Sequence, residues 1–206
     1  MNAAKPRKVR DGLALKIVDV GPDRLQAYAG VPIAYQVESI LKIDLLDGGL
    51  GGAGLEEVQI APAYLKDYDA GQDSGPLSWP EKFDLKNFGF FLALDGDRPV
   101  GAAAAVYDSP DIHMLCGRRD MAVLWDIRVR PESRRSGIGA RLFEHAAQWA
   151  RAKNCRLLKI ETQNVNVPAC RFYSRMGGRL GEINRYAYAG HPGVAQEVML
   201  IWYLDL

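Results

Sequence analysis

A stretch near the middle of the chain, "RPESRRSGIGARLFEHAAQWARAK" (130–153), runs from basic residues and glycines into a long helical pattern. It directly follows "VLWDIRV" (123–129), which is apolar enough to be a strand. Glycine lets a backbone approach a ligand closely, and a helix N-terminus carries free amide N–H groups with a partial positive charge. Arginine binds planar oxyanions such as phosphate. Together these residues predict a cradle for a phosphorylated ligand at a helix start.

Three glycine-rich phosphate-binding patterns compete for this loop. A P-loop ends in Gly-Lys-Ser/Thr, and neither this loop nor the glycine-rich stretch 47–54 contains that ending. A dinucleotide fingerprint needs a third glycine, but Leu142 stands at that position, and residues 131–136 separate the strand from the first glycine. The third pattern, Arg/Gln-x-x-Gly-x-Gly/Ala, is matched by "RRSGIG" at 134–139.

The elements around this loop must hold it beside the rest of the site. Asp95-Gly96-Asp97 between two apolar runs predicts a β-hairpin over 88–107. Apolar residues that recur with helical spacing predict helices over 137–153 and 166–178. Further strands are expected at 13–20, 36–46, 121–129, 156–162, 179–188 and 197–206, and a structured surface loop at 62–87. The order, β-rich and then β-α-β-α-β-β, predicts a mixed α/β sheet.

Two motifs in this context resemble those of a known superfamily. The loop at 134–139 resembles the acetyl-CoA loop of the GNAT superfamily of N-acetyltransferases, and Asn166-x-x-Ala169-x-x-Phe172-Tyr173 resembles its other signature. "LWDIRV", "ETQNVNVPACRFY", "EVMLIWYLDL" and the upstream "YLKDYD" are similar to streptothricin acetyltransferases, which acetylate an amino group of the β-lysine part of the antibiotic. Gly178 departs from the Gly-Phe that often follows the tyrosine helix.

The resemblance implies a fold, a reaction and a co-substrate. The fold is the α/β GNAT (acyl-CoA N-acyltransferase) fold, with a mixed, mostly antiparallel sheet flanked by helices, as a single domain over 1–206. The reaction is acetyl-CoA-dependent N-acetylation of a small cationic antibiotic of the streptothricin kind, which confers resistance. The alternatives are another amine, such as a polyamine, an amino acid or a protein lysine, or a non-catalytic acetyl-CoA sensor. A sensor would need neither an acid nor a base.

The resemblance also implies which residues bind the cofactor. Backbone amides of Arg135, Ser136, Gly137, Ile138 and Gly139 would hold the pyrophosphate, with side-chain charge from Arg134 or Arg135. Backbone groups near Ile127 and Val129 would pair with the pantetheine arm as an added strand would. Asn166 would cap its helix, contact the cofactor, or both.

Acetyl transfer to an amine needs an acid for the departing thiolate and a group that takes a proton from the amine. A lysine-type amine has a pKa of about 10.4 and arrives mostly protonated. Tyr173 is the candidate acid, and the alternative is a core tyrosine on an amphipathic helix. Asp126 and Glu161 are candidate bases or amine anchors, because a carboxylate is rarely found in an apolar strand unless it has a partner or a function. The alternative for both is a salt bridge, with Arg128, Lys159 or another cation.

Acidic and aromatic residues upstream are candidates for the mouth of a cationic-substrate site. They are Asp67 and Asp69, together with Tyr64 and Trp79. A solvated loop is the alternative for each of them.

The composition limits the partners. The chain has 206 residues, with 26 basic and 25 acidic ones, which gives no reason to expect nucleic acid. Three cysteines without a CxxC pair fit a reducing compartment, and no apolar run approaches the length of a membrane span. We therefore expect a cytoplasmic protein with a small-molecule amine as partner, no membrane and no metal site. A homodimer is compatible with the sequence, which leaves the oligomeric state open.

Overall fold

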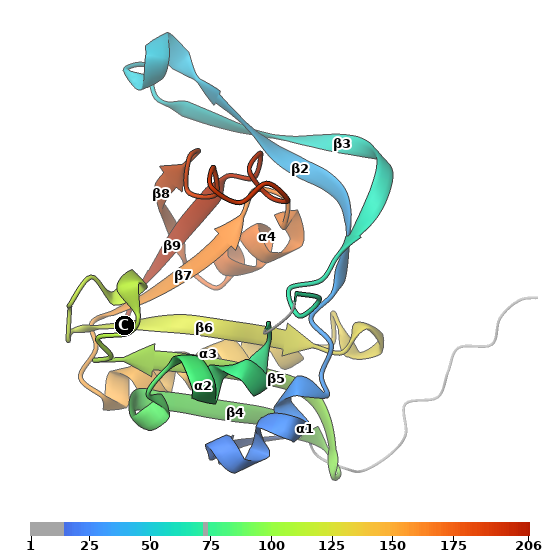
Figure 1. The fold of residues 1–206 in the computed structure, drawn as a ribbon, viewed down its shortest axis with the longest axis vertical. Helices are drawn as coiled ribbons and strands as arrows, with labels where there is room; N and C mark the ends of the chain where they lie inside the picture. Colours follow the sequence, from blue (N-terminus) through green and yellow to red (C-terminus); the bar gives the residue numbers. More distant parts are fainter. Residues whose placement is uncertain (1–14, 72–73) are drawn as a thin grey trace, which may run out of the picture.

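A computed structural model describes residues 15–71 and 74–206, so the first two residues of the predicted strand 13–20 lie outside it. A seven-stranded sheet has the order β1-β4-β5-β6-β7-β9-β8, and β2 and β3 form a separate ribbon (Figure 1). The strands are β1 (Lys16–Val20), β2 (Tyr35–Leu45), β3 (Ala53–Lys66), β4 (Phe88–Asp95), β5 (Arg98–Tyr107), β6 (Met121–Val129), β7 (Leu157–Gln163), β8 (Arg179–Asn184) and β9 (Met199–Asp205). The helices are α1 (Leu25–Ala29), α2 (Trp79–Lys82), α3 (Ile138–Ala152) and α4 (Val167–Arg175).

The sheet is mixed and mostly antiparallel, as predicted. Within it only the β6–β7 pair runs parallel, because α3 connects those two strands as a crossover. The predicted hairpin is the pair β4–β5, and the predicted strand 121–129 matches β6. The predicted order of alternating elements from β6 to β9 is therefore confirmed.

The central strands are apolar on both faces because helices cover both. Phe91 and Ala103 belong to the core cluster that includes α3, while Phe90 and Ala104 belong to the cluster beneath α1 and α2. Figure 1 shows α1 and α2 in front of the sheet and α3 behind it. Small residues let α3 come close: a Cβ added at Gly101 would lie 2.9 Å from the side chains on the first turns of α3.

Two predicted segments were wrong, and a short helix was not predicted. Residues 62–66, predicted to be loop, continue strand β3, and residues 185–188, predicted to be strand, form a turn after β8. Helix α1 was not predicted, since its five residues are too few for a helical period. Strand β3 carries Pro62 and many exposed positions, because it pairs only with β2 in a long arm (Figure 1) and lacks the alternation of a half-buried strand.

The strands β6 and β7 separate from each other halfway along. They pair only from Met121 to Leu124 and then diverge, as Figure 1 shows. The register between β5 and β6 shifts at this point, where Trp125 is the extra residue of a bulge. The rest of β6 has no strand on its β7 side, so its backbone edge there is open for an added strand.

Candidate active site

The loop between β6 and α3 has the conformation that its glycines and arginines predict. Arg135 has φ 62° and Gly137 has φ 87°, and α3 begins directly after Gly137. Among the described residues, the amides of residues 135–139 have no hydrogen-bond acceptor. Five consecutive free N–H groups at a helix start make an anion site, which fits a pyrophosphate.

The two loop arginines have different surroundings. Arg134 donates from Nε to the Val129 carbonyl (3.0 Å) and from Nη2 to the Ala34 carbonyl (2.7 Å). Burial lowers the pKa of its guanidinium. Arg134 therefore fastens the loop to the protein, whereas Arg135 is exposed and remains available for a phosphate. Ser136 donates to the Ser133 carbonyl (2.5 Å).

The end of β6, the start of α3 and α4 meet at one place. The side chains of Ile127 and Val129 are half-buried against the core that includes α3. A Cβ added at Gly139 would lie 3.8 Å from the Val129 side chain and 3.7 Å from the Phe172 ring. The open backbone edge predicted to bind pantetheine thus lies beside the loop predicted to bind pyrophosphate.

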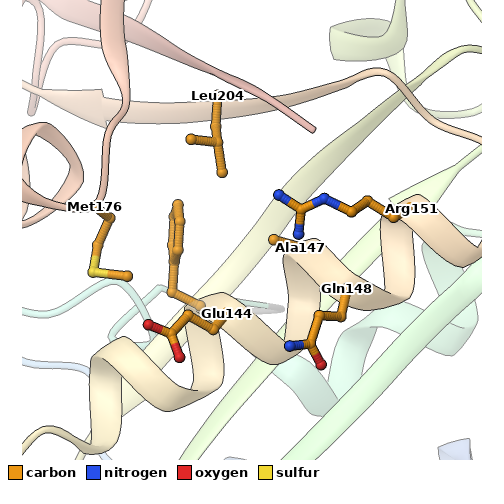
Figure 2. Close-up of a pocket in the computed structure, with 7 residues that line it drawn as sticks. Glu144, Ala147, Gln148, Arg151, Met176 and Leu204 are labelled. Carbon is orange, nitrogen blue, oxygen red and sulfur yellow. The ribbon is translucent and has the colours of Figure 1, made fainter.

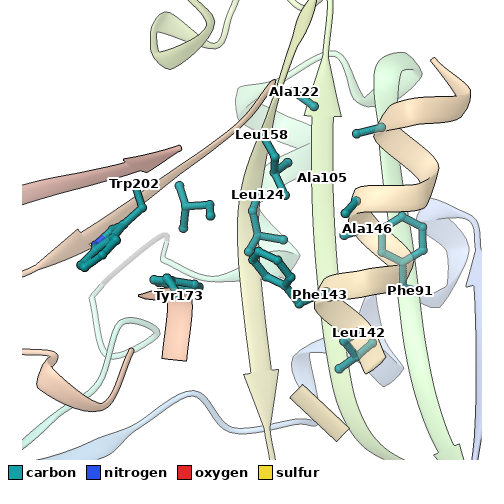
Figure 3. Close-up of a cluster of buried hydrophobic side chains, with 14 of the residues drawn as sticks. Phe91, Ala105, Ala122, Leu124, Leu142, Phe143, Ala146, Leu158, Tyr173 and Trp202 are labelled. Carbon is teal, nitrogen blue, oxygen red and sulfur yellow. The ribbon is translucent and has the colours of Figure 1, made fainter. Parts of the chain in front are cut away.

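Helix α4 begins with the predicted cap and carries the candidate acid. Asn166 Oδ1 accepts from the Ala169 amide (3.2 Å), and Asn166 Nδ2 donates to the Tyr68 hydroxyl (3.4 Å). Tyr173 is 6% exposed, and its ring lies 6.2 Å from that of Phe143 (Figure 3). Tyr173 is therefore a core residue, but its hydroxyl has no hydrogen-bond partner in residues 15–71 and 74–206.

Burial raises the pKa of Tyr173, and the nearby Tyr68 and Asp126 raise it further. The phenol therefore stays protonated at neutral pH, as a general acid must. The neighbouring Cys170 is buried, which raises its thiol pKa to about 12, so it is a core residue and not an activated nucleophile.

The two strand carboxylates have different partners. Asp126 accepts from Arg128 Nε (2.8 Å) and Nη2 (2.7 Å), and from the Tyr28 hydroxyl (2.8 Å). Arg128 is 3% exposed and also donates to Asp69 (2.6 Å) and to the Val31 carbonyl (3.2 Å). Asp126 thus makes the salt bridge with Arg128 that the sequence left open as an alternative, and both its oxygens are occupied.

Glu161 has no cationic partner in the described part of the chain. Lys159, the cation nearest in sequence, pairs with Glu182 (3.5 Å) instead. Glu161 Oε1 accepts from the Tyr188 hydroxyl (2.7 Å), and among the described residues its other oxygen has no hydrogen bond. A half-buried carboxylate with one free oxygen is chemically suited to hold an ammonium group or to take a proton from it.

The four upstream residues do not come together as one mouth. Asp69 reaches the site through Arg128, and Asp67 accepts from the Asp69 amide (3.0 Å). Tyr64 is 41% exposed on β3. Trp79 departs from the expectation: it is 7% exposed, and its ring packs against those of Tyr28 (5.5 Å) and Phe90 (6.1 Å). Its proline-rich surroundings resemble a surface loop, but α2 folds it into the core.

Three residues near Glu161 were missed by sequence reasoning. Gln163 donates to the Tyr188 hydroxyl (2.9 Å) and accepts from the Tyr68 hydroxyl (2.5 Å). Tyr68 lies between Asp67 and Asp69, which are candidate substrate-binding residues, so its position in the sequence could have indicated a role in the site. Tyr188 lies in the turn after β8 and carried no signal, because nothing local places it near β7.

Two hollows on the surface lie away from these residues. One, with a volume of about 230 Å³, lies between α3, the end of α4 and β9 (Figure 2). Another, of about 430 Å³, lies near the C-terminus. None of the predicted site residues lines either hollow. Within the described residues, no group of three His, Cys, Asp or Glu side chains could hold a metal, and no helix could cross a membrane.

The buried tyrosines predict a loss of stability at alkaline pH. Burial raises the pKa of seven of the nine tyrosines above 10.0, namely Tyr28, Tyr35, Tyr64, Tyr68, Tyr173, Tyr188 and Tyr203. A pKa raised by folding means that stability is complete below the unfolded value and falls as pH rises above it. We expect the thermal midpoint to fall steeply above about pH 10. Phenolate absorbance should rise together with unfolding; full ionisation of a folded protein near that pH would contradict this.

Known proteins resemble this chain in sequence and in fold. The family model "Acetyltransferase (GNAT) family" matches residues 58–178. A streptothricin acetyltransferase of Escherichia coli is 36% identical over 186 residues, which are 90% of this chain and 94% of that one. A streptothricin acetyltransferase of Streptomyces lavendulae is 29% identical over 82% of this chain and 84% of its own length.

A solved structure of a protein from Bacillus anthracis str. Ames in complex with acetyl coenzyme A has a TM-score of 0.72 and 25% identity. The match covers 94% of this chain and 98% of that one. The mixed, mostly antiparallel sheet agrees with these matches. The chain therefore belongs to the GNAT family of acetyltransferases, and it is an acetyl-CoA-dependent N-acetyltransferase similar to the streptothricin acetyltransferases.

Proposed function

We propose that this enzyme acetylates an amino group of a streptothricin, on the β-lysine part, and so confers resistance to the antibiotic. The relative named a streptothricin acetyltransferase that is 36% identical over 90% of this chain supports this substrate class. The observation that carries the proposal is the half-buried Glu161, a carboxylate without a cation among the described residues, on the strand that diverges from β6.

The charges around the divergence of β6 and β7 favour a polycation. Arg128 is shared between the carboxylates of Asp126 and Asp69, so this cluster keeps an excess of negative charge. Glu161 adds a further negative charge on the β7 side. Such a field raises the encounter rate with a polycationic antibiotic in a salt-dependent way. Asp126 and Asp69 thus act mainly through their field, while Glu161 binds the reacting amine.

The proposed roles divide the site into a cofactor side and an amine side. On the cofactor side, the amides of 135–139, Arg135 and the open edge at Ile127 and Val129 bind acetyl-CoA. On the amine side, Glu161 holds the ammonium group and takes its proton. Tyr173 gives a proton to the thiolate as it forms; its raised pKa keeps that proton on the phenol, and its hydroxyl has no hydrogen-bond partner among the described residues.

Incubation of the purified enzyme with acetyl-CoA and streptothricin is expected to release free thiol and to add one acetyl group to the β-lysine part. Expression in a sensitive bacterium is expected to give resistance, and a Tyr173→Phe variant expressed to the same level should not. Mass spectrometry of the antibiotic locates the acetyl group. Spermidine, free lysine and a lysine peptide serve as competing amines. Turnover of one of these with an unmodified antibiotic would contradict the substrate while leaving the acetyltransferase activity intact.

A further inference from the structure

Tyr188 reaches Glu161 from a distant part of the chain. It lies in the turn between β8 and β9, and its hydroxyl is within 2.7 Å of Glu161 Oε1 and 2.9 Å of Gln163 Nε2. Glu161 and Gln163 are two residues apart on β7, so their side chains lie on the same face of the sheet. Tyr188 is therefore held between two side chains of one strand.

The direction of each hydrogen bond around Tyr188 follows from the cap of α4. Asn166 uses its Oδ1 to accept from the Ala169 amide, so the group facing Tyr68 is its Nδ2, a donor. Tyr68 then donates its proton to Gln163 Oε1 (2.5 Å) and not to the more distant Tyr35 hydroxyl (3.3 Å). With its oxygen engaged, Gln163 presents its Nε2 donor to Tyr188.

Tyr188 therefore accepts from Gln163 and has one proton left, which only Glu161 receives among the described residues. A donor fixed on one oxygen fixes the orientation of the carboxylate. The second oxygen of Glu161 is left free for a ligand. The chain of hydrogen bonds thus begins at Asn166, the cap of the helix that carries Tyr173, and ends at the carboxylate of Glu161 on β7.

Two ties keep the distant segments in place. Lys66, at the end of the β2–β3 arm, forms a buried ion pair with Glu197, which follows the Tyr188 turn. Asn164 accepts from the Val198 amide (2.8 Å) and donates to the Leu41 carbonyl (3.0 Å), so it joins β9 to the same arm. Figure 1 shows the turn, in dark red, beneath the arm. These ties bring Tyr68 and Tyr188 to β7.

We propose that Tyr188 is a positioning residue for the acceptor amine: oriented by the chain Asn166–Tyr68–Gln163, it fixes the orientation of the Glu161 side chain and leaves one oxygen for the substrate ammonium. This inference rests on the amine-binding role proposed above for Glu161, and it does not depend on which amine the enzyme acetylates.

The test compares Tyr188→Phe with Tyr186→Phe. Tyr186 lies in the same turn and is 79% exposed, so Tyr186→Phe is a matched control that also removes one hydroxyl. A hydrogen bond to a charged group predicts that Tyr188→Phe raises the KM for the amine about tenfold or more. The KM for acetyl-CoA should stay within about twofold of wild type, and Tyr186→Phe should leave both constants unchanged.

A double-mutant cycle separates positioning from general damage. In a Glu161→Gln background, Tyr188→Phe should change the amine KM much less than in wild type, because the charged group that it holds is gone. An unchanged amine KM in folded Tyr188→Phe would overturn the proposal, and so would an effect that persists fully in Glu161→Gln.

A second variant and a choice of amine keep the test decisive. If Tyr188→Phe does not fold, Gln163→Leu breaks the same chain one step earlier and should raise the amine KM about threefold or more; an unchanged KM there overturns the proposal equally. If wild type acetylates a polyamine or a peptide lysine but not streptothricin, the substrate proposal fails. The same variants are then measured with the amine that wild type acetylates.

Discussion

Replacement of Gly137 by valine is expected to weaken the binding of CoA by roughly 10²-fold or more. Gly137 has φ 87°, a conformation that costs a β-branched residue about 1–3 kcal/mol. A Cβ added there meets nothing within 4 Å, so the chain can accept the side chain, but the valine would stand in the space that a phosphate needs. Relaxation of the backbone would also turn away the free amides of 135–139 that are proposed to bind the pyrophosphate. Calorimetric titration with CoA measures the effect.

The control for this variant is Gly117→Val. Gly117 has φ 71° and likewise no atom within 4 Å of an added Cβ, but it lies in the turn before β6. It should lose a similar amount of stability and keep its affinity for CoA. Wild-type affinity in a folded Gly137→Val protein would contradict the placement of the pyrophosphate at this loop.

Replacement of Tyr173 by phenylalanine is expected to lower kcat by roughly 10²-fold, with little change in the affinity for CoA. The variant keeps the ring that packs against Phe143 and removes only the hydroxyl. Because that hydroxyl has no partner among the described residues, its loss should leave the thermal midpoint equal to or above that of wild type. Steady-state kinetics together with thermal unfolding therefore separate a role in catalysis from a role in packing.

Tyr107→Phe is the matched control for Tyr173→Phe. Tyr107 is half-buried, with its ring 5.6 Å from that of Trp149, and it lies at the end of β5 that pairs with the start of β6. Its kcat should equal that of wild type. A Tyr173→Phe enzyme with full kcat would show that Tyr173 is a core residue alone and that another group protonates the thiolate.

Local chemistry was enough to predict the elements that form the proposed cofactor side of the site. The glycines of 134–139 favour positive φ, a helical period follows them, and Asn166 followed by Pro168 marks the start of the next helix. Each of these signals acts within a few residues along the chain. The loop, α3, α4 and the hairpin β4–β5 therefore lie where the sequence predicts them.

The amine side could not be predicted in the same way, because its partners are far apart along the chain. Glu161 and Tyr188 are separated by 27 residues, and Arg128 and Asp69 by 59. The sequence offered Asp126 and Glu161 as equal candidates. Tertiary structure distinguishes them: Asp126 forms an ion pair with Arg128, whereas Glu161 accepts a hydrogen bond from a tyrosine hydroxyl.

The sequence alone determined the mixed sheet, the glycine loop that opens α3 and the tyrosine helix, since periodicity, caps and glycine conformations are local properties. Only the tertiary structure decided that Trp79 is a core residue, that β2 and β3 form an arm, and that Arg128 pairs with both Asp126 and Asp69. These outcomes depend on which distant surfaces are buried together and which charges are paired there, and no short stretch of the chain carries that information.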